Sequence, residues 1–390
     1  MKVAILTFFN NGNFGSELQA IAMGVFLQNL GYNPVFCKCG STKLIGRIVR
    51  LISRKCKEKI YVIFNKEFRS MNIALRENAL KQCAISLETR KKIHEDSKKL
   101  ICSTVINTNK LKYQFDAYIC GSDQIWSPFI MPLKKEYYLP FVPTEKKIAY
   151  GPSFGVSQLP EYHKNKIYKM VDKFKFLSVR ESNAIPIVQN LCGKTPKLVC
   201  DPTILISSEK WNELVDANIG TEDTVKAKYV FAYFLGRMEK ELHDIIITEF
   251  KDFRIILQPK QEVSFSENIK SEDMGLFSFL NGIRNAEYVI TDSFHGTVFS
   301  VLFKKKFVVF SRNNVDKIKQ VSRLDSFLAI LGITHRFWNG ETSLKTLIQE
   351  DINYDQVLLK LKKYQKQSQI YLQNALKEIE EKNKVERKIE

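Results

Sequence analysis

Short apolar runs alternate with amphipathic stretches along most of this chain, a pattern typical of α/β proteins with parallel sheets. An apolar run over residues 2–8 leads into the glycine-bearing loop NNGNFG, and residues 16–30 then show helical periodicity. A second apolar run, NPVFCKC, follows. We therefore expect a strand, a helix and a strand, with a capping box at Ser16 and Gln19 and a helix stop at Gly31.

The same alternation resumes near residue 115 and continues to about residue 310. Strand candidates are FDAYIC, KIAY, KFLSV and KLVC in the first part, and YVFAYF, RIILQ, EYVIT and FVVF in the second. A Thr- and charge-rich segment separates the two groups. The pattern predicts two successive α/β domains, residues 1–216 and 217–350, followed by a helical tail over residues 351–390.

Residues from about 41 to 100 interrupt the first domain with a basic helical insert, which mixes Ile, Leu and Val with Lys and Arg at helical spacing. One interpretation is a basic amphipathic surface that approaches anionic lipid. The other is an ordinary helix with its apolar face on the domain and its cations in solvent, which is the more common arrangement.

The whole chain carries a net charge of +18, which suits polyanions, anionic lipid or acidic small substrates. It has no zinc-finger or RNP-type motif, so we expect no nucleic-acid partner. None of its eight cysteines forms a CxxC pair, which indicates reduced thiols in a cytoplasmic protein and no metal site. No apolar run reaches the ~18–20 residues of a membrane span, and we interpret the apolar start as a strand rather than a signal peptide.

Ligands of open α/β sheets bind outside the carboxyl ends of the strands. One of only five histidines, His295, stands at such a place, a sharp strand-to-helix turn. Histidine is suited to proton transfer at neutral pH, although a turn histidine can equally be structural. The loops that follow predicted strands are Asn10–Ser16, Gly121–Trp126, Arg180–Ser182, Gly236–Arg237 and Asp292–Thr297.

The chain resembles the polysaccharide pyruvyl transferases in a series of spaced landmarks. These are NNGNFGSELQAIAM, ICGSDQIW, LSVRES, VCDPTILIS and TDSFHGTVFSVLFKKKFVVF, spread over roughly residues 1–310. The combination of GSDQIW with DSFHG is the most specific part. The resemblance implies two Rossmann-like domains that face each other across a cleft, similar to B-type glycosyltransferases.

The resemblance also implies a reaction in which phosphoenolpyruvate gives its pyruvate to two sugar hydroxyls as a ketal, with no metal or other cofactor. The acceptor would be a sugar of an exopolysaccharide, capsule or cell-surface glycan precursor. If a lipid carrier holds that precursor at the inner face of the cell membrane, the basic insert has a reason to be basic. The expected location is the cytoplasm, with peripheral contact to anionic membrane as an option.

Phosphoenolpyruvate carries a carboxylate and a phosphate, so its site needs fixed cations, and Arg offers bidentate geometry. Matching the motifs residue by residue implies His295 as the acid–base residue and Arg180 as an anion clamp. An ion pair with Glu181 or with an acid at the domain interface is the alternative for Arg180. The predicted donor side comprises Arg180, Ser293, Phe294, His295, Gly296 and Arg237, and the predicted acceptor side comprises Asn11, Asn13, Ser122, Asp123 and Gln124.

Several of these residues have a second interpretation. The loop from Asn11 to Gly15 could present backbone N–H groups to an anion at a helix N-terminus. Residues 122–124 carry groups that bind sugar hydroxyls, but they could instead cap a helix that begins at Ile125. Asp292 could orient the nearby histidine, although we favour a cap on the following helix.

One departure from the family pattern concerns the donor. Better-understood members carry Arg two places before the histidine, and here that position is Ser293. Either another cation takes its place or the donor differs. Two rival functions also stay open, namely a two-domain glycosyltransferase that uses a nucleotide sugar and a non-catalytic binder of acidic glycan or anionic lipid. The candidate replacement cations are Arg237, Arg254, Arg312 and Arg323.

Overall fold

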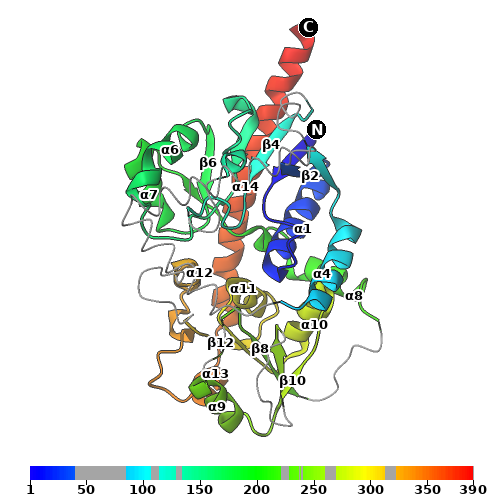
Figure 1. The fold of residues 1–390 in the computed structure, drawn as a ribbon, viewed down its shortest axis with the longest axis vertical. Helices are drawn as coiled ribbons and strands as arrows, with labels where there is room; N and C mark the ends of the chain where they lie inside the picture. The colour runs from blue at the N-terminus through cyan, green and yellow to red at the C-terminus, as the bar shows by residue number, and fades with distance from the viewer. Residues whose placement is uncertain are drawn as a thin grey trace, which may run out of the picture.

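A computed structural model of the protein describes residues 1–39, 85–106, 114–128, 134–220, 228–236, 238, 240–259, 269–311 and 322–389 (Figure 1). Within these residues lie a sheet of seven strands and a sheet of five, and every strand pair is parallel. Helices connect the strands and cover the sheets. The prediction of two Rossmann-like α/β folding units is confirmed.

The first sheet has the strand order β3-β2-β1-β4-β5-β6-β7. The chain moves outward from β1 in one direction and from β4 in the other, so the order reverses between these two central strands. The crevice at such a reversal is where open sheets bind ligands. The strands are β1 (Lys2–Leu6), β2 (Asn33–Cys39), β3 (Ser103–Ile106), β4 (Ala117–Cys120), β5 (Lys147–Ala149), β6 (Phe176–Val179) and β7 (Lys197–Leu198).

The second sheet has the order β10-β9-β8-β11-β12, and it reverses between β8 and β11. The loop after β11 carries His295, so the histidine stands beside the second reversal point. The strands are β8 (Tyr229–Tyr233), β9 (Arg254–Gln258), β10 (Ile269–Ser271), β11 (Tyr288–Thr291) and β12 (Lys306–Val309).

Helices follow the strands in both units. In the first they are α1 (Phe14–Asn29), α4 (Leu87–Leu100), α6 (Glu161–Val171), α7 (Ala184–Cys192) and α8 (Ser208–Asp216), with 3-10 turns η1 (Lys135–Tyr138), η2 (Thr144–Lys146) and η3 (Pro202–Ile204). In the second they are α9 (Lys240–Glu249), α10 (Leu276–Asn285), α11 (Phe294–Leu302), α12 (Ser322–Leu331), η5 (Thr334–Arg336) and α13 (Leu344–Gln349). A long helix, α14 (Tyr354–Ile389), ends the described chain.

Helix α1 joins the two units through its first turn. The side chain of Asn13 caps it by accepting a hydrogen bond from Ser16 N, so the predicted capping box at Ser16 is wrong. The ring of Phe14 stacks on Phe279 of α10, with ring centroids 4.3 Å apart. Both rings are fully buried, and the contact fixes the start of α1 against the second unit.

Helix α4 is the described part of the predicted basic insert, and residues 40–84 of that insert lie outside the described residues. Its inner face packs between α1 and α10. Ser97 Oγ donates to Glu17 in α1 at 3.0 Å, and Asp96 Oδ2 accepts the N–H of Leu276 at the start of α10 at 2.8 Å. The helix therefore connects the two units, and its lipid-binding interpretation stays a prediction.

Helix α14 covers residues that were predicted as a helical tail, and it runs back from the second unit along the first sheet (Figure 1). Its last turns meet Asp116, to which Arg387 donates a hydrogen bond at 2.6 Å. There it lines a cavity of about 390 Å³ beside Lys2 and Asn33, at the amino ends of the central strands and opposite the loops predicted to bind ligand. Within the described parts of the chain, no helix is both long and apolar enough to cross a membrane.

Candidate functional site

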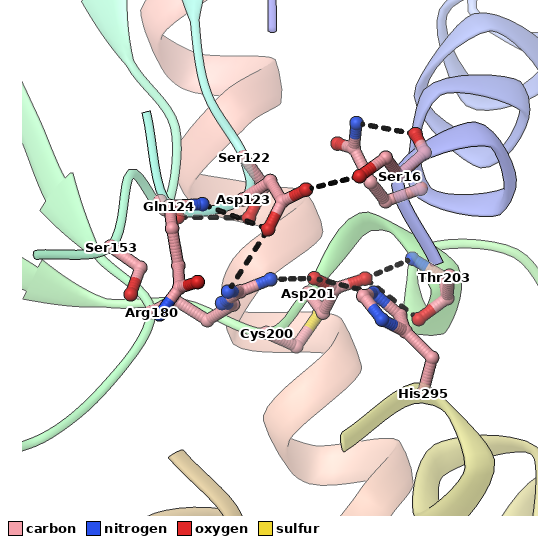
Figure 2. A network of polar contacts seen from close by, with 12 residues as sticks. Ser16, Ser122, Asp123, Gln124, Ser153, Arg180, Cys200, Asp201, Thr203 and His295 are labelled. Carbon is pink, nitrogen blue, oxygen red and sulfur yellow. Dashed lines mark hydrogen bonds and ion pairs between the residues drawn. The ribbon is translucent and has the colours of Figure 1, made fainter. Parts of the chain in front are cut away.

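Polar side chains from both units meet in one buried network at the carboxyl ends of the strands (Figure 2). Asp123 follows β4, Arg180 follows β6 and Asp201 follows β7, while His295 stands in the first turn of α11 after β11. Their exposed fractions are 7%, 4%, 1% and 8% in that order. Burial of four ionisable groups together is expensive unless they pair, so their contacts define the site.

Arg180 lies between two carboxylates. Its Nη1 donates to Asp201 Oδ2 at 2.5 Å, and its Nη2 is 3.7 Å from Asp123 Oδ1. Burial alone would lower the pKa of Arg180, but these carboxylates outweigh that effect and raise it, so the guanidinium stays charged. Among the described residues, its Nε and Nη2 have no hydrogen-bond partner. One edge of the fork is therefore available to an anion.

Glu181 is not the partner of Arg180 in a hydrogen bond. Its Oε1 instead accepts from Ser153 Oγ at 2.8 Å and from Phe154 N at 3.1 Å, and the residue is fully buried. Of the two structural alternatives for Arg180, the ion pair with another acid is the one that the structure contains.

Asp201 is absent from the candidate residues that the sequence indicates, although it directly follows the predicted strand KLVC. Its Oδ1 caps η3 by accepting from Thr203 N at 3.0 Å and Thr203 Oγ1 at 2.8 Å. Its Oδ2 faces Arg180 and lies 3.6 Å from His295 Nε2. Burial would raise the pKa of Asp201, but His295, Arg180 and the Thr203 N–H together hold it well below the ordinary value. An acid directly after a strand was the available signal.

The His295 ring rests on the first turn of α1. A Cβ placed on Gly15 would lie 2.0 Å from His295 Nδ1, so only glycine leaves room for the ring there. The other nitrogen, Nε2, is buried and has no hydrogen-bond partner in the described residues. The histidine thus contacts the first unit on two sides, through Gly15 and through Asp201.

Two guanidinium groups approach the ring of Phe294. Arg180 Cζ is 5.0 Å from the ring centroid and Arg323 Cζ, from α12, is 6.0 Å from it. Of the four candidate replacement cations, Arg323 is therefore near the site. Arg254, at the start of β9, instead pairs with Glu272. Arg237 and Arg312 lie outside the described residues.

The remaining donor-side residues support the backbone around His295. Ser293, 1% exposed, caps α11 by accepting from Gly296 N at 3.4 Å. The prediction that Asp292 caps this helix is wrong, because its two oxygens accept the N–H groups of Leu235 and Gly236 at 2.7 and 2.8 Å. Gly296 lets α11 approach the sheet, since a Cβ there would lie 2.5 Å from Thr291 Oγ1.

The polar groups of the loop after β1 form hydrogen bonds with one another and with α1. Asn11 N donates to Glu17 Oε1 at 2.9 Å, and the Asn11 side chain accepts from Asn13 N at 3.0 Å. The Asn13 side chain caps α1. The carboxylate of Glu17 thus occupies the place that the sequence assigned to an external anion, and burial raises the pKa of Glu17.

The loop after β4 forms a turn, and no helix begins at Ile125. Ser122 Oγ donates to Gly151 O at 2.8 Å and is fully buried. Asp123 Oδ2 accepts from Ser16 Oγ at 2.7 Å, which ties this loop to α1. The Gln124 side chain passes over Gly155, where a Cβ would lie 2.2 Å from Nε2. Of this group, Asp123 shares the network of Arg180.

A family model described as polysaccharide pyruvyl transferase matches residues 13–314, well over half of the chain. The chain belongs to the polysaccharide pyruvyl transferase family. No curated protein gives a significant match. The family match includes Asp123, Arg180, Asp201 and His295, and it ends before α14 begins.

Solved structures similar to this pyruvyl transferase family member include an epimerase and two transferases. A Methanocaldococcus jannaschii UDP-GlcNAc 2-epimerase is 12% identical, covering 93% of this chain and 100% of that one, with a TM-score of 0.46. The spinosyn forosaminyltransferase SpnP is 10% identical over 97% and 99%, also at 0.46. A Rickettsia africae glycosyltransferase is 13% identical over 98% and 96%, at 0.43.

Within the described ranges, no group of three or more His, Cys, Asp or Glu side chains is placed to hold a metal ion. The expectation of a reaction without a metal or other cofactor stays a prediction. The organic groups that the network does offer are a guanidinium edge whose Nε and Nη2 make no hydrogen bond to the described residues, an imidazole and a carboxylate. Such a set can bind an anion and transfer a proton.

Proposed function

We propose that this family member transfers pyruvate from phosphoenolpyruvate to two hydroxyls of a sugar, forming a ketal on a cell-surface polysaccharide precursor. The observation that carries the proposal is the buried Arg180 guanidinium, whose Nε and Nη2 lack hydrogen-bond partners among the described residues, in one network with His295. Buried donors without partners are rare and costly in a folded protein, and an anionic ligand would satisfy them.

Phosphoenolpyruvate needs two cationic contacts, one for its carboxylate and one for its phosphate. The Nε–Nη2 edge of Arg180, which makes no hydrogen bond to the described residues, has the bidentate geometry for either group. Arg323, on the same Phe294 ring, supplies the second positive charge in place of the Arg that Ser293 replaces. Because Arg180 and His295 are more than nine-tenths buried, donor entry requires the elements around the network to move apart.

The reaction needs a proton for the donor methylene and a base for the sugar hydroxyl. One hydroxyl adds to C2 while the methylene carbon takes up a proton, which leaves a tetrahedral centre bearing methyl, carboxylate, phosphate and the sugar oxygen. Inorganic phosphate then leaves and the second hydroxyl attacks, so the two hydroxyl protons end on the methyl group and on phosphate or solvent. No oxidant or reductant is required.

His295 is our candidate for these proton transfers. A carboxylate that holds one imidazole nitrogen leaves the other to exchange protons with the substrate. Asp201 Oδ2 lies 3.6 Å from Nε2, so a small ring movement makes that hydrogen bond, and Nδ1, beside Gly15, becomes the reactive nitrogen. The low pKa of Asp201 keeps its carboxylate anionic throughout the working pH range.

We assign the acceptor sugar to the side of the first unit. Asp123 and Gln124 adjoin the network and carry groups that bind sugar hydroxyls, whereas the amide oxygens of Asn11 and Asn13 already accept hydrogen bonds within their loop. An exopolysaccharide or capsule precursor on a lipid carrier, a cytoplasmic location and a peripheral contact of the basic insert with anionic membrane complete the proposal.

The test is to incubate the protein with phosphoenolpyruvate and candidate glycans and to follow inorganic phosphate together with the mass of the ketal product. His295→Gln should lower turnover by roughly 10²- to 10⁴-fold, the usual range for a lost acid–base residue. His243→Gln is the matched control, since His243 also lies beside an acid, 3.3 Å from Asp244, but in α9. Undiminished turnover by His295→Gln would remove the assigned role.

Thermal stabilisation by a nucleoside diphosphate and none by phosphoenolpyruvate would favour a nucleotide-sugar enzyme instead.

A further inference from the structure

Helix α14 holds the chain just before Asp201, although some 165 residues separate the two in sequence. The Tyr364 hydroxyl donates to Val199 O at 2.7 Å. Ser368 Oγ accepts from Cys200 N at 2.8 Å and donates to its own helix at Tyr364 O, also at 2.8 Å. The helix therefore fixes both residues that lead into the Asp201 turn.

These bonds replace a sheet ladder that has ended. Strand β7 stops at Leu198, so Cys200 lies beyond it and needs other partners for its buried peptide groups. Its N–H goes to Ser368, and its C=O accepts from the Tyr150 hydroxyl at 3.0 Å. A buried N–H left without a partner is costly, so the Ser368 contact is hard to replace.

The same helix also contacts the unit that carries His295. The Tyr354 hydroxyl donates to Lys305 O and approaches Ser300 O, in α11, at 3.4 Å. Lys360 Nζ donates to Leu331 O at the end of α12 at 3.2 Å. From Tyr354 to Ser368 a continuous helix spans about 21 Å. One rigid element thus touches the helix of His295 at one point and the loop of Asp201 at another.

We propose that Tyr364 and Ser368 are positioning residues, through which α14 sets the place of Asp201 relative to Arg180 and His295. The expected effect on catalysis rests on the proposed function. The placement of Asp201 by α14 does not depend on that function. Asp201 Oδ2 lies 2.5 Å from Arg180 Nη1 and 3.6 Å from His295 Nε2. A displacement of about 1 Å would change both contacts, and misplacement on that scale can lower a rate by on the order of 100-fold.

Two substitutions that each remove a side-chain hydroxyl, and one matched control, test the inference. Ser368→Ala and Tyr364→Phe each remove one hydrogen bond to the residues that precede Asp201. Gln369→Ala is the control, because Gln369 Nε2 donates to Leu205 O at 2.8 Å from the same helix but beyond η3, on the other side of Asp201. Tyr364→Phe keeps nearly all of the side chain, so the test survives if Ser368→Ala does not fold.

The first readout needs no substrate. The ¹⁵N signals of the His295 ring and of the Arg180 guanidinium are recorded in the ligand-free protein. Both should move in Ser368→Ala and Tyr364→Phe and stay in place in Gln369→Ala. Unchanged signals in the two variants, or equal changes in all three, would overturn the inference even if the pyruvyl transfer is correct.

The second readout is steady-state kinetics with phosphoenolpyruvate. The two variants should lower kcat by roughly 10- to 100-fold, because the carboxylate orients the proton-transferring ring, and KM for the donor should rise as well, because the same carboxylate holds Arg180. Moved NMR signals in a protein without any pyruvyl transfer would retain the geometric inference and reject the proposed function. A kcat equal to that of Gln369→Ala would reject the positioning role.

Discussion

The loops after β1 and after β11 make the same strand-to-helix connection at the reversal point of their sheets. They differ in whether their polar groups find hydrogen-bond partners nearby. After β1, the N–H of Asn11 is bound by Glu17 and the N–H of Asn13 by the Asn11 side chain. After β11, Asp292 and Ser293 secure the backbone, and His295 is left with a buried nitrogen that has no hydrogen-bond partner in the described residues.

The difference predicts that the loop after β1, whose polar groups bond to one another, contributes less to ligand binding than the loop after β11. Glycine has a matching role in the two loops. Gly15 clears space for the histidine of the other unit, and Gly296 clears space for its own helix to reach the sheet. The His295 ring, which follows β11, therefore rests on the loop after β1.

The largest expected effect contrasts the two buried carboxylates, Asp201 and Glu17. Asp201→Asn removes the partner of the buried Arg180 and should lower the free energy of unfolding by about 3–5 kcal/mol. Glu17→Gln loses only part of its hydrogen bonding and should cost about 1–3 kcal/mol. Denaturant unfolding at neutral pH measures both.

The pH dependence of these two losses should have opposite signs. The pKa of Asp201 is lowered, so its stabilisation is fully present above the ordinary value of 3.8 and disappears as the pH falls through the folded-state value. The pKa of Glu17 is raised, so its carboxylate disfavours folding increasingly as the pH rises from 4.5 to the folded-state value. The same slope for both variants, relative to the unsubstituted protein, would contradict the contrast.

Gly15→Ala should have the next largest effect. The new Cβ would meet His295 Nδ1 at 2.0 Å, so the ring must move, and kcat should fall by on the order of 100-fold, equivalent to about 2.7 kcal/mol. Gly24→Ala in the same helix is the control, because its nearest neighbour is a Phe36 ring atom at 3.4 Å. That variant should keep its kcat and gain up to about 1 kcal/mol of stability. Equal kcat values for the two variants would contradict the claim that catalysis needs glycine at position 15.

Asn11→Ala should have the smallest effect on the reaction. Its side chain is exposed and accepts the N–H of Asn13, so KM for the acceptor should change by less than about twofold. Steady-state kinetics at varied acceptor concentration provide the measurement. A tenfold rise in that KM would show that the loop after β1 binds the sugar after all.

The sequence predicted the α/β alternation because buried parallel strands and amphipathic helices leave distinct periodicities. It also placed His295 and Arg180 at strand ends, where ligands bind. It could not show that Asp201 joins them, since the contact links β7 to α11 across the two units. Nor could it show that Glu17 fills the Asn11 loop or that Ser293, not Asp292, caps α11, because each choice depends on which neighbour lies within hydrogen-bond distance.

The most direct test of the site measures the affinity of phosphoenolpyruvate, without an acceptor, for the unsubstituted protein, for Arg180→Lys and for Arg387→Lys. Arg387 also pairs with an aspartate, Asp116, but at the amino ends of the strands. Losing a charge-assisted contact of about 1.5–3 kcal/mol should weaken binding by Arg180→Lys roughly 10- to 100-fold, while Arg387→Lys binds like the unsubstituted protein. Equal affinity in all three proteins would contradict a donor site built around Arg180.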